Sequence, residues 1–320
     1  MEAWHCPARL TCPRSRVKTQ TMPRIESRSP DFKVRLKDRW PVYFWRRYPQ
    51  FLRANGWDFS RVNAVPRDAV RQALELGYLR WPKALATWCQ GRDVVDVGCG
   101  MGLHGIGFLL EGATSYAGVD PLIKPKSGML KSLHSGKRLD CGWTPEMLMA
   151  RMDRFEMIRG LSTELEGKRQ FDVATLHNAT EHLTDLAGVF SSVARLLRPQ
   201  GRIIFSHHNW FSWNGHHQEP KIISRVDLTK WEHQRFVDWA HLDGAHPPDH
   251  YVMTKLNRLR LDEVRALTDQ HFEIEVARTF LSTTNQGAGR LTDAIRARHP
   301  DLKEADLTTQ SLFCVARLKS

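Results

Sequence analysis

The residues best suited to chemistry in this sequence form a glycine-rich loop with acidic side chains nearby. The segment DVVDVGCGMGLHG, residues 93–105, runs from a short apolar stretch into Gly98, Gly100 and Gly102. Glycine permits a tight turn and close approach of a ligand, and the helix that follows supplies amide donors. Asp120 ends the next apolar stretch, where a carboxylate can accept hydrogen bonds from both ribose hydroxyls of a nucleoside. This spacing predicts a site for a nucleoside-containing cofactor.

Two classes of cofactor fit the loop. Gly100, Gly102 and Gly105 satisfy the GxGxxG spacing of dinucleotide-binding sites, so the glycines alone leave NAD open. Asp96 lies inside the end of the strand, two residues before Gly98, where NAD-binding loops usually have an apolar or neutral residue. An acid at that position suits a zwitterionic amino-acid tail and disfavours a pyrophosphate. The sequence therefore favours a cofactor with an amino-acid tail.

Alternating strands and helices are expected to position this loop. Apolar patterns predict strands at 93–97, 115–119, 155–158, 171–176, 202–206, 272–276 and 312–317, and helices at 102–110, 147–154, 183–196 and 261–270. Such an order predicts an α/β fold, with a doubly wound seven-stranded sheet covered by helices on both faces. Residues 37–90 contain short helical patterns after Pro66 and Pro82 and are expected to form an N-terminal helical cap.

These segments resemble the motifs of class I S-adenosylmethionine (SAM)-dependent methyltransferases. VVDVGCGMGLHG is similar to the family's first motif, and YAGVDP resembles its second, acidic motif. FDVATLHNATEHL and LLRPQGRIIFSHHN resemble the fourth-strand and fifth-strand motifs of the "type 11" group, which acts on small molecules. The resemblance implies a Rossmann-like methyltransferase domain over 91–320, with an insert after the fifth strand and SAM as the cofactor.

The resemblance also assigns roles to individual residues. Asp120 would hold the ribose, Ser162 and Thr163 would lie near the adenine, and His177 and Asn178 would face the sulfonium. Gly102 fits a role in helix packing equally well. The full set of expected cofactor-binding residues is Asp96, Gly98, Cys99, Gly100, Gly102, Asp120, Ser162, Thr163, His177 and Asn178.

A segment rich in histidine and tryptophan follows the fifth strand. Residues 207–250 hold eight of the fifteen histidines and four tryptophans, including Trp210 and Trp213. Because ligands bind beyond the carboxyl ends of strands in such sheets, this insert is expected to form the acceptor pocket and its lid. The tryptophans would shape that pocket by stacking on the acceptor.

Methyl transfer to a hydroxyl often needs a base, and histidine is the usual choice. His208 or His207, at the strand end, is the expected base, and His182, oriented by Glu181, is a further candidate. Glu181 and His182 could instead only cap a helix. Whether a metal is needed stays open: ligand types are plentiful, at His216, His217, Asp238, His241, Asp243, His246 and His250, but no HExxH pattern occurs.

The expected reaction is methylation of a small-molecule or glycan acceptor at a hydroxyl oxygen. HNAT stands after the fourth strand, where the nucleic-acid amino-methyltransferases have a DPPY or NPPF motif. Three alternatives are weighed against this reaction: an RNA methyltransferase, a SAM-binding module without catalysis, and an NAD-dependent oxidoreductase. The RNA alternative rests on a basic N-terminal arm, because residues 1–47 hold twelve Lys and Arg against four acids.

Composition places the chain among globular proteins. The net charge is +12, and residues 1–36 are expected to be a disordered arm, with Met22 as a possible alternative start. No apolar run of about 18 residues predicts a membrane span, and no secretory h-region opens the chain. The six cysteines include no CxxC pair. We therefore expect a cytoplasmic protein without a membrane span; its oligomeric state is left open.

Overall fold

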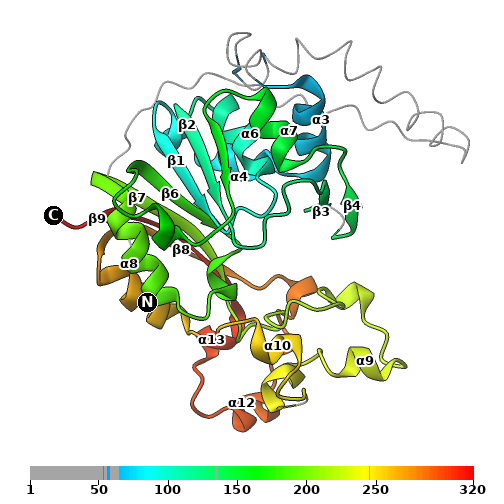
Figure 1. Ribbon diagram of the computed structural model, residues 1–320. Coiled ribbons are helices and arrows are strands. Elements are labelled where there is room, and N and C mark those ends of the chain that lie inside the picture. The colour runs from blue at the N-terminus through cyan, green and yellow to red at the C-terminus, as the bar shows by residue number, and fades with distance from the viewer. Residues whose placement is uncertain (1–52, 54–55, 58–64, 134–135, 245) are drawn as a thin grey trace, which may run out of the picture. The chain divides into compact units, whose positions relative to one another are not determined.

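Seven strands pair into one mixed sheet that carries the glycine loop (Figure 1). The computed structural model describes residues 53, 56–57, 65–133, 136–244 and 246–320, and all but two of these lie in one compact unit, Trp57–Ser320. The strands are β1 (Asp93–Val97), β2 (Ser115–Val119), β5 (Phe155–Ile158), β6 (Phe171–His177), β7 (Leu197–His208), β8 (Phe272–Leu281) and β9 (Thr309–Leu318).

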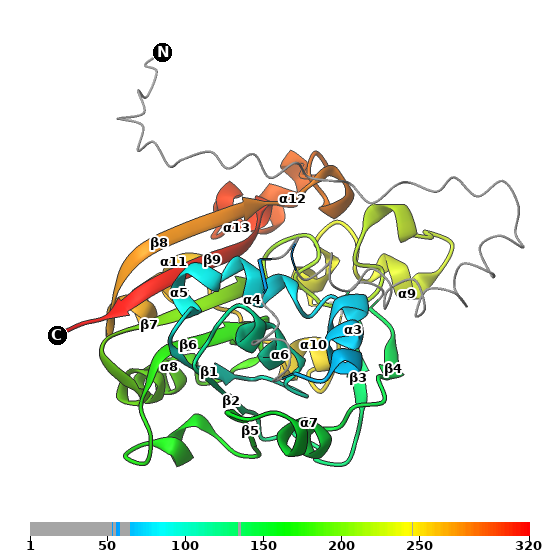
Figure 2. The same cartoon turned by 90° about the horizontal axis from the view of Figure 1, so that it is seen from above.

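The order of strands across the sheet is β5-β2-β1-β6-β7-β9-β8. The first five strands run parallel, whereas β9 is antiparallel to both β7 and β8. Figure 2 shows β8 and β9 side by side at one edge, with β5 at the other. All seven strands were expected from the sequence, and the predicted doubly wound α/β fold is confirmed.

Helices form a layer on each side of this sheet. On one side α3 (Arg67–Leu76) and α4 (Arg80–Ala84) pack on α6 (Leu103–Leu110), and α5 (Ala86–Cys89) follows α4. On the other side α8 (Leu186–Leu196) contacts α11 (Leu261–Asp269) over the main apolar core. The helix α7 (Pro145–Arg151) packs beside β5.

Parts of the predicted N-terminal organisation cannot be compared with the structure. The basic arm, 1–36, and most of 37–64 lie outside the described residues. The described part of the predicted cap, from 65 onward, is helical. No helix among the described residues is both long enough and apolar enough to cross a membrane.

Several elements differ from the expected bounds; for example, α7 covers Pro145–Arg151 and not 147–154. A hairpin of β3 (Met129–Lys131) and β4 (Arg138–Asp140), which the sequence did not predict, follows β2. The helix α8 begins at Leu186 and not at 183, because the Asp185 side chain accepts a hydrogen bond from the Gly188 amide and caps it there.

Glycine brings α6 close to the sheet. A Cβ atom on Gly105 would lie 2.5 Å from ring carbons of both Phe155 and Tyr116. Only a residue without a side chain permits this approach, which sets the helix directly behind the loop that ends β1. Gly105 completes the dinucleotide-like spacing noted in the sequence, and its role in this fold is packing.

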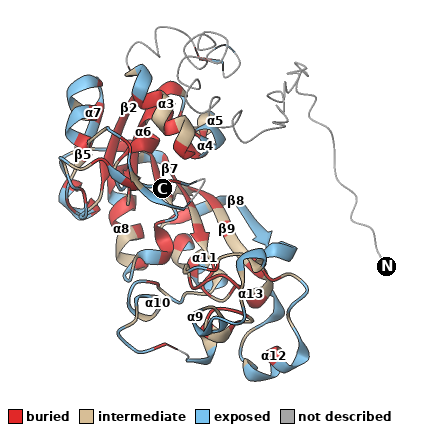
Figure 3. Cartoon of the chain, turned by 90° about the vertical axis from the view of Figure 1, so that its right-hand side faces the viewer, coloured by how far each residue is buried: buried red, intermediate tan, exposed pale blue. Residues whose placement is uncertain are grey.

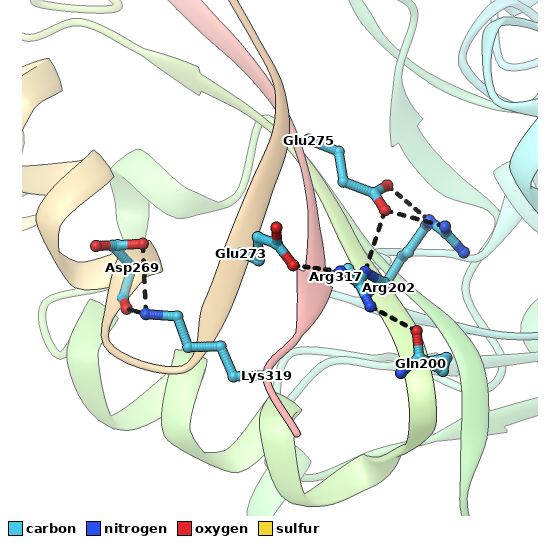
Figure 4. Close-up of polar contacts among 7 residues, drawn as sticks. All are labelled: Gln200, Arg202, Asp269, Glu273, Glu275, Arg317 and Lys319. Carbon is cyan, nitrogen blue, oxygen red and sulfur yellow. Dashed lines mark hydrogen bonds and ion pairs between the residues drawn. The ribbon is translucent and has the colours of Figure 1, made fainter.

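Polar contacts join β7, β8 and β9 at the end of the sheet where β7 begins (Figure 4). Arg202 donates to both carboxylate oxygens of Glu275, at 2.8 and 3.0 Å. Arg317 donates to Gln200 Oε1 at 2.7 Å and also pairs with Glu273. Each exposed pair contributes little alone, on the order of 0 to 1 kcal/mol. Together with the backbone ladder they hold β9 in register against β7.

The segment after β7 has its own small core. It contains α9 (Trp231–Gln234) and α10 (Tyr251–Thr254), which Figure 1 shows away from the sheet. Other residues of the segment pack on α12 (Asp293–Arg298) and α13 (Glu304–Thr308). Trp213, Trp239 and Ile295 pack together there. Figure 3 shows that α12, the helix that carries Ile295, is otherwise largely exposed. Trp213 is fully buried, so the expectation that it stacks on an acceptor is wrong. Its surface is used to fold the insert against residues 287–307.

We predict that Gly105→Ala destabilises the protein by about 2 kcal/mol, although alanine is the better helix former. The added methyl group would overlap two aromatic rings that cannot easily move. Gly91→Ala is the matched control, because its Cβ would meet nothing within 4 Å and only its positive φ of 70° adds cost, about 1 kcal/mol. Urea unfolding measures both; equal losses would contradict the packing role of Gly105.

Candidate active site

The carboxyl ends of β1 and β6 define the first part of the site. The strand order reverses between them, because β1 connects through α6 to β2 on one side while β6 lies on the other. Asp96 on β1 is in register with Thr175 on β6. The predicted glycine loop and the predicted pair His177 and Asn178 therefore lie at the same edge, where ligands bind in doubly wound sheets.

Backbone geometry explains the glycines of this loop. Gly98, Gly100 and Gly102 all have positive φ, at 78°, 58° and 80°. A Cβ on Gly102 would overlap the Met157 sulfur at 2.3 Å, so this glycine serves packing. A Cβ on Gly100 would meet nothing within 4 Å, so open space lies beside that residue. The Cys99 side chain is buried and lies beside Gly118 of β2.

Asp120 ties the end of β2 to the glycine loop. Its Oδ2 accepts a hydrogen bond from the Gly100 amide at 3.0 Å, and its Oδ1 accepts one from the Leu122 amide at 2.7 Å. A carboxylate has about four acceptor positions, so each oxygen keeps one for a further donor. Asp120 is half-buried and lies next to the open space at Gly100, as a ribose-binding residue must.

Asp96 is buried behind the loop. It is 1% exposed, and the Tyr116 hydroxyl donates to its Oδ2 at 2.9 Å. Burial raises the pKa of the Asp96 carboxyl to about 7, while the hydrogen bond from Tyr116 opposes this rise. Tyr116 was not predicted as part of the site, because its role depends on pairing between β1 and β2. A buried acid of this kind gains stability when a cationic group binds beside it.

The remaining predicted cofactor residues lie at the end of β6 or just beyond the ends of β5 and β6. Ser162 is buried and Thr163 exposed in a short turn after β5. The His177 ring packs against Trp81 of α4 in a tilted arrangement, with ring centroids 4.6 Å apart. Burial lowers the pKa of the His177 imidazole to about 3. Asn178 is exposed, with a positive φ of 50°.

The residues at this edge fit SAM. The open space beside Gly100 lets a cofactor approach the backbone closely. The free acceptor positions of Asp120 suit a ribose, and the buried acid Asp96 suits an ammonium group. When bound, SAM supplies a methyl group on a sulfonium that is ready for displacement. The chain's contribution is to bind and orient it.

A cavity of about 510 Å³ lies beyond the carboxyl ends of β6 and β7. Asn178, Glu181 and His182 line it from the segment after β6. His208 ends β7, and its Nδ1 is buried without a hydrogen-bond partner. His217 comes from the insert. The structure thus brings together two of the three predicted catalytic histidines in one pocket.

The third predicted catalytic residue, His207, lies outside this cavity. It is 1% exposed, and its Nδ1 lies 3.0 Å from Thr180 Oγ1. Residues alternate sides along a strand, so His207 and its neighbour His208 point to opposite faces of β7. Pairing with β9, where His207 faces Leu312 and His208 faces Ser311, fixes that alternation. His207 therefore positions the segment after β6.

Burial shapes the electrostatics of the cavity. It raises the pKa of the Glu181 carboxyl to about 7, against hydrogen bonds from the backbone of Glu181 and His208. It lowers the pKa of His208 to about 3, with a smaller effect of the Lys221 charge. Burial also lowers the pKa of Lys221, and nearby Lys131 acts in the same direction. The cavity therefore combines imidazoles and the carboxyls of Glu181 and Glu219 with the cations Lys131, Lys221 and Arg225.

Sequence reasoning missed several lining residues. Lys131 comes from the β3–β4 hairpin and Lys221 from the insert, and no local pattern distinguishes either lysine from a surface one. His217 was noted only within a larger group of possible ligands. The neighbouring residues His216 and His217 point apart: His216 packs on Phe236, while His217 contacts the ring of His208.

The fold and site define a class I SAM-dependent methyltransferase, and comparisons with known proteins agree. Residues 64–262, more than half of the chain, match a family described as a methyltransferase domain. The chain belongs to this family, and SAM is its cofactor. The alternative of an NAD-dependent oxidoreductase is wrong.

Curated relatives and solved structures are similar at low identity. The chain is 27% identical over 176 residues to a ubiquinone biosynthesis O-methyltransferase of Salmonella paratyphi A, covering 49% of this chain and 66% of the relative. It is 28% identical to the enzyme of that name from Escherichia coli, over 54% of this chain and 72% of the relative. The chain thus spans just under two thirds of the length of the Salmonella relative. A putative SAM-dependent methyltransferase structure from Listeria monocytogenes has a TM-score of 0.46 at 14% identity, covering 76% of this chain and 99% of that one.

We predict that Asp120→Ala weakens S-adenosylhomocysteine binding at least about tenfold, because two charge-assisted hydrogen bonds to the ribose would be lost. Titration calorimetry measures the affinity. Asp153→Ala is the control, since Asp153 is exposed and remote from the loop. Unchanged affinity of the Asp120 variant would remove this residue from the cofactor site.

The Asp96 carboxyl predicts a pH dependence of stability. Its folded pKa of about 7 lies above the ordinary value of 3.8, so the folded chain holds this proton more tightly than the unfolded chain. The resulting stability is present at low pH and is lost as pH rises from about 4 to about 7. Asp96→Asn should therefore stabilise the ligand-free protein relative to wild type increasingly from pH 5 to pH 8, by at most about 4 kcal/mol. Denaturant unfolding at both pH values tests this; a difference that does not grow with pH would contradict it.

Proposed function

We propose that the protein transfers the methyl group of SAM to a hydroxyl oxygen of a small molecule bound in the 510 Å³ cavity. One observation carries the proposal: Asn178, at the end of β6 beside the cofactor edge, also lines the cavity that contains His182 and His208. A molecule in that cavity would have its reacting atom next to the cofactor edge. Displacement at a methyl group needs this in-line placement.

His208 is the proposed base for the acceptor hydroxyl. Its Nδ1 is buried without a partner, so its hydrogen-bonding capacity is available to a ligand. A hydroxyl held there would give up its proton to the imidazole as its oxygen attacks the methyl carbon. His182 lines the same cavity and is the second candidate for this role.

Size and relatives support a small hydroxylated acceptor. The cavity volume lies within the usual range for small-molecule sites, roughly 300–1,000 Å³. The curated relatives are named as O-methyltransferases, which favours oxygen as the acceptor atom. We place the reaction in the cytoplasm, a compartment that suits the free thiols at Cys89, Cys99, Cys141 and Cys314.

We predict that His208→Ala lowers kcat by roughly 100-fold or more and leaves S-adenosylhomocysteine affinity within about twofold. The acceptor would first be found by S-adenosylhomocysteine release with a panel of phenols, catechols and sugars. His271→Ala is the control, because His271 lies at the start of β8, away from the cavity. Normal turnover of the His208 variant would reject it as the base, and a methyl group on nitrogen in the product would reject the proposed acceptor.

A further inference from the structure

We propose that Glu181, His182 and His217 bind one divalent transition-metal ion in the acceptor cavity. The inference rests on the proposed function for the role of the ion, but its evidence is the arrangement of these three side chains. Their ligand atoms all lie within 4.8 Å of one another. Two imidazoles and one carboxylate form a ligand set of known catalytic metal centres, which keep further positions open for water or substrate.

Two buried polar atoms of the cavity have no hydrogen-bond partner, and this favours a bound ligand. Glu181 is 2% exposed, and its Oε1 has no hydrogen-bond partner. A buried polar atom without a hydrogen-bond partner destabilises the fold, and more strongly if it is charged. The buried Nδ1 of His208, on the neighbouring wall of the cavity, is also without a partner. A bound cation would satisfy the Glu181 carboxylate directly.

The surrounding chain orients the His182 ring. Its Nδ1 lies 3.2 Å from the Lys255 carbonyl oxygen, which can only accept a hydrogen bond. The proton is therefore on Nδ1, and Nε2 keeps its lone pair for a ligand. Metal-binding histidines are typically held in this way by a carbonyl or carboxylate on their other nitrogen.

Asn257 holds the backbone that carries two of the ligands. Its side-chain amide donates to the carbonyl oxygens of Thr180 at 2.7 Å and Leu183 at 2.9 Å, and its own backbone amide donates to Glu181 O at 2.8 Å. Three bonds from one residue fix the segment 180–183. Precise ligand placement of this kind favours metal binding over a loose histidine cluster.

The third ligand comes from the insert. His217 has a positive φ of 58°, and its ring meets those of His182 and His208 edge-on, with centroids 5.2 and 4.4 Å apart. This conformation, uncommon for a residue with a side chain, turns His217 toward the cavity while its neighbour His216 is buried elsewhere. The insert thus completes the site.

The charges of the cavity indicate which ion and which role. Imidazole ligands favour transition-metal ions such as Zn²⁺ over Mg²⁺, Ca²⁺ and Mn²⁺, which prefer oxygen ligands. Of the three proposed ligands only Glu181 is anionic, and in the cavity the cations Lys131, Lys221 and Arg225 outnumber the carboxyls Glu181 and Glu219. A deprotonated acceptor oxygen would supply a further anionic ligand. The ion would therefore bind and polarise the acceptor hydroxyl.

The test is metal binding by the tag-free, full-length chain after removal of metals with EDTA. Zn²⁺ titrated by calorimetry is expected to bind with one-to-one stoichiometry, and Co²⁺ should give visible absorption bands of a low-coordinate site. Glu181→Gln and His217→Ala should each weaken Zn²⁺ binding at least about tenfold. His271→Ala should bind Zn²⁺ like wild type, and S-adenosylhomocysteine affinity should be the same for all four proteins.

Three outcomes separate this proposal from the proposed function. Absence of stoichiometric Zn²⁺ binding, or equal binding by wild type and both ligand variants, overturns the metal site. Methylation of a hydroxyl at full rate by EDTA-treated protein also overturns the ion's catalytic role, while leaving the O-methyltransferase proposal standing. Site-specific Zn²⁺ binding without any hydroxyl methylation supports the metal site and rejects the proposed reaction.

Discussion

The short segment that follows β6 is the constraint on which both halves of the site depend. Because β6 pairs with β1 on one side and β7 on the other, residues just beyond its end reach the glycine loop and the acceptor cavity. Thr180 fixes this segment: its hydroxyl contacts His207 Nδ1 at 3.0 Å and the Ser206 carbonyl at 3.3 Å. Its own carbonyl accepts from Asn257. A shift here would move Asn178 and His182 together.

The same segment shows how far sequence reasoning reaches. The glycine loop and Asp120 could be predicted because their roles follow from local backbone geometry and from the ends of consecutive strands. His182 and His208 were named because strand ends carry ligands in doubly wound sheets. Their partners were not predictable, since His217 joins them only through an insert whose path no periodic pattern sets.

Part of the tryptophan and histidine content of that insert lies in its own core. Both residue types serve a small folding core as readily as a binding site. Trp213 is fully buried beside Trp239, and His241 is buried with its Nε2 3.0 Å from the Trp210 carbonyl. Because an insert of this size must bury apolar surface to fold at all, much of its aromatic content is used inside it. Composition alone cannot separate the two uses.

The glycine-loop side of Asn178 and the acceptor cavity on its other side differ in charge. Behind the glycine loop, the buried acid Asp96 and the half-buried Asp120 give an acidic environment that suits a cationic cofactor. In the cavity, the cations Lys131, Lys221 and Arg225 outnumber the carboxyls Glu181 and Glu219, so the net formal charge has the opposite sign. A sulfonium is attracted to the first compartment and an oxyanion to the second. In the proposed reaction the sulfonium and the oxyanion would lose their charges together as the methyl group moves between them, so the two compartments would bring the charged reactants together and would hold the products less tightly.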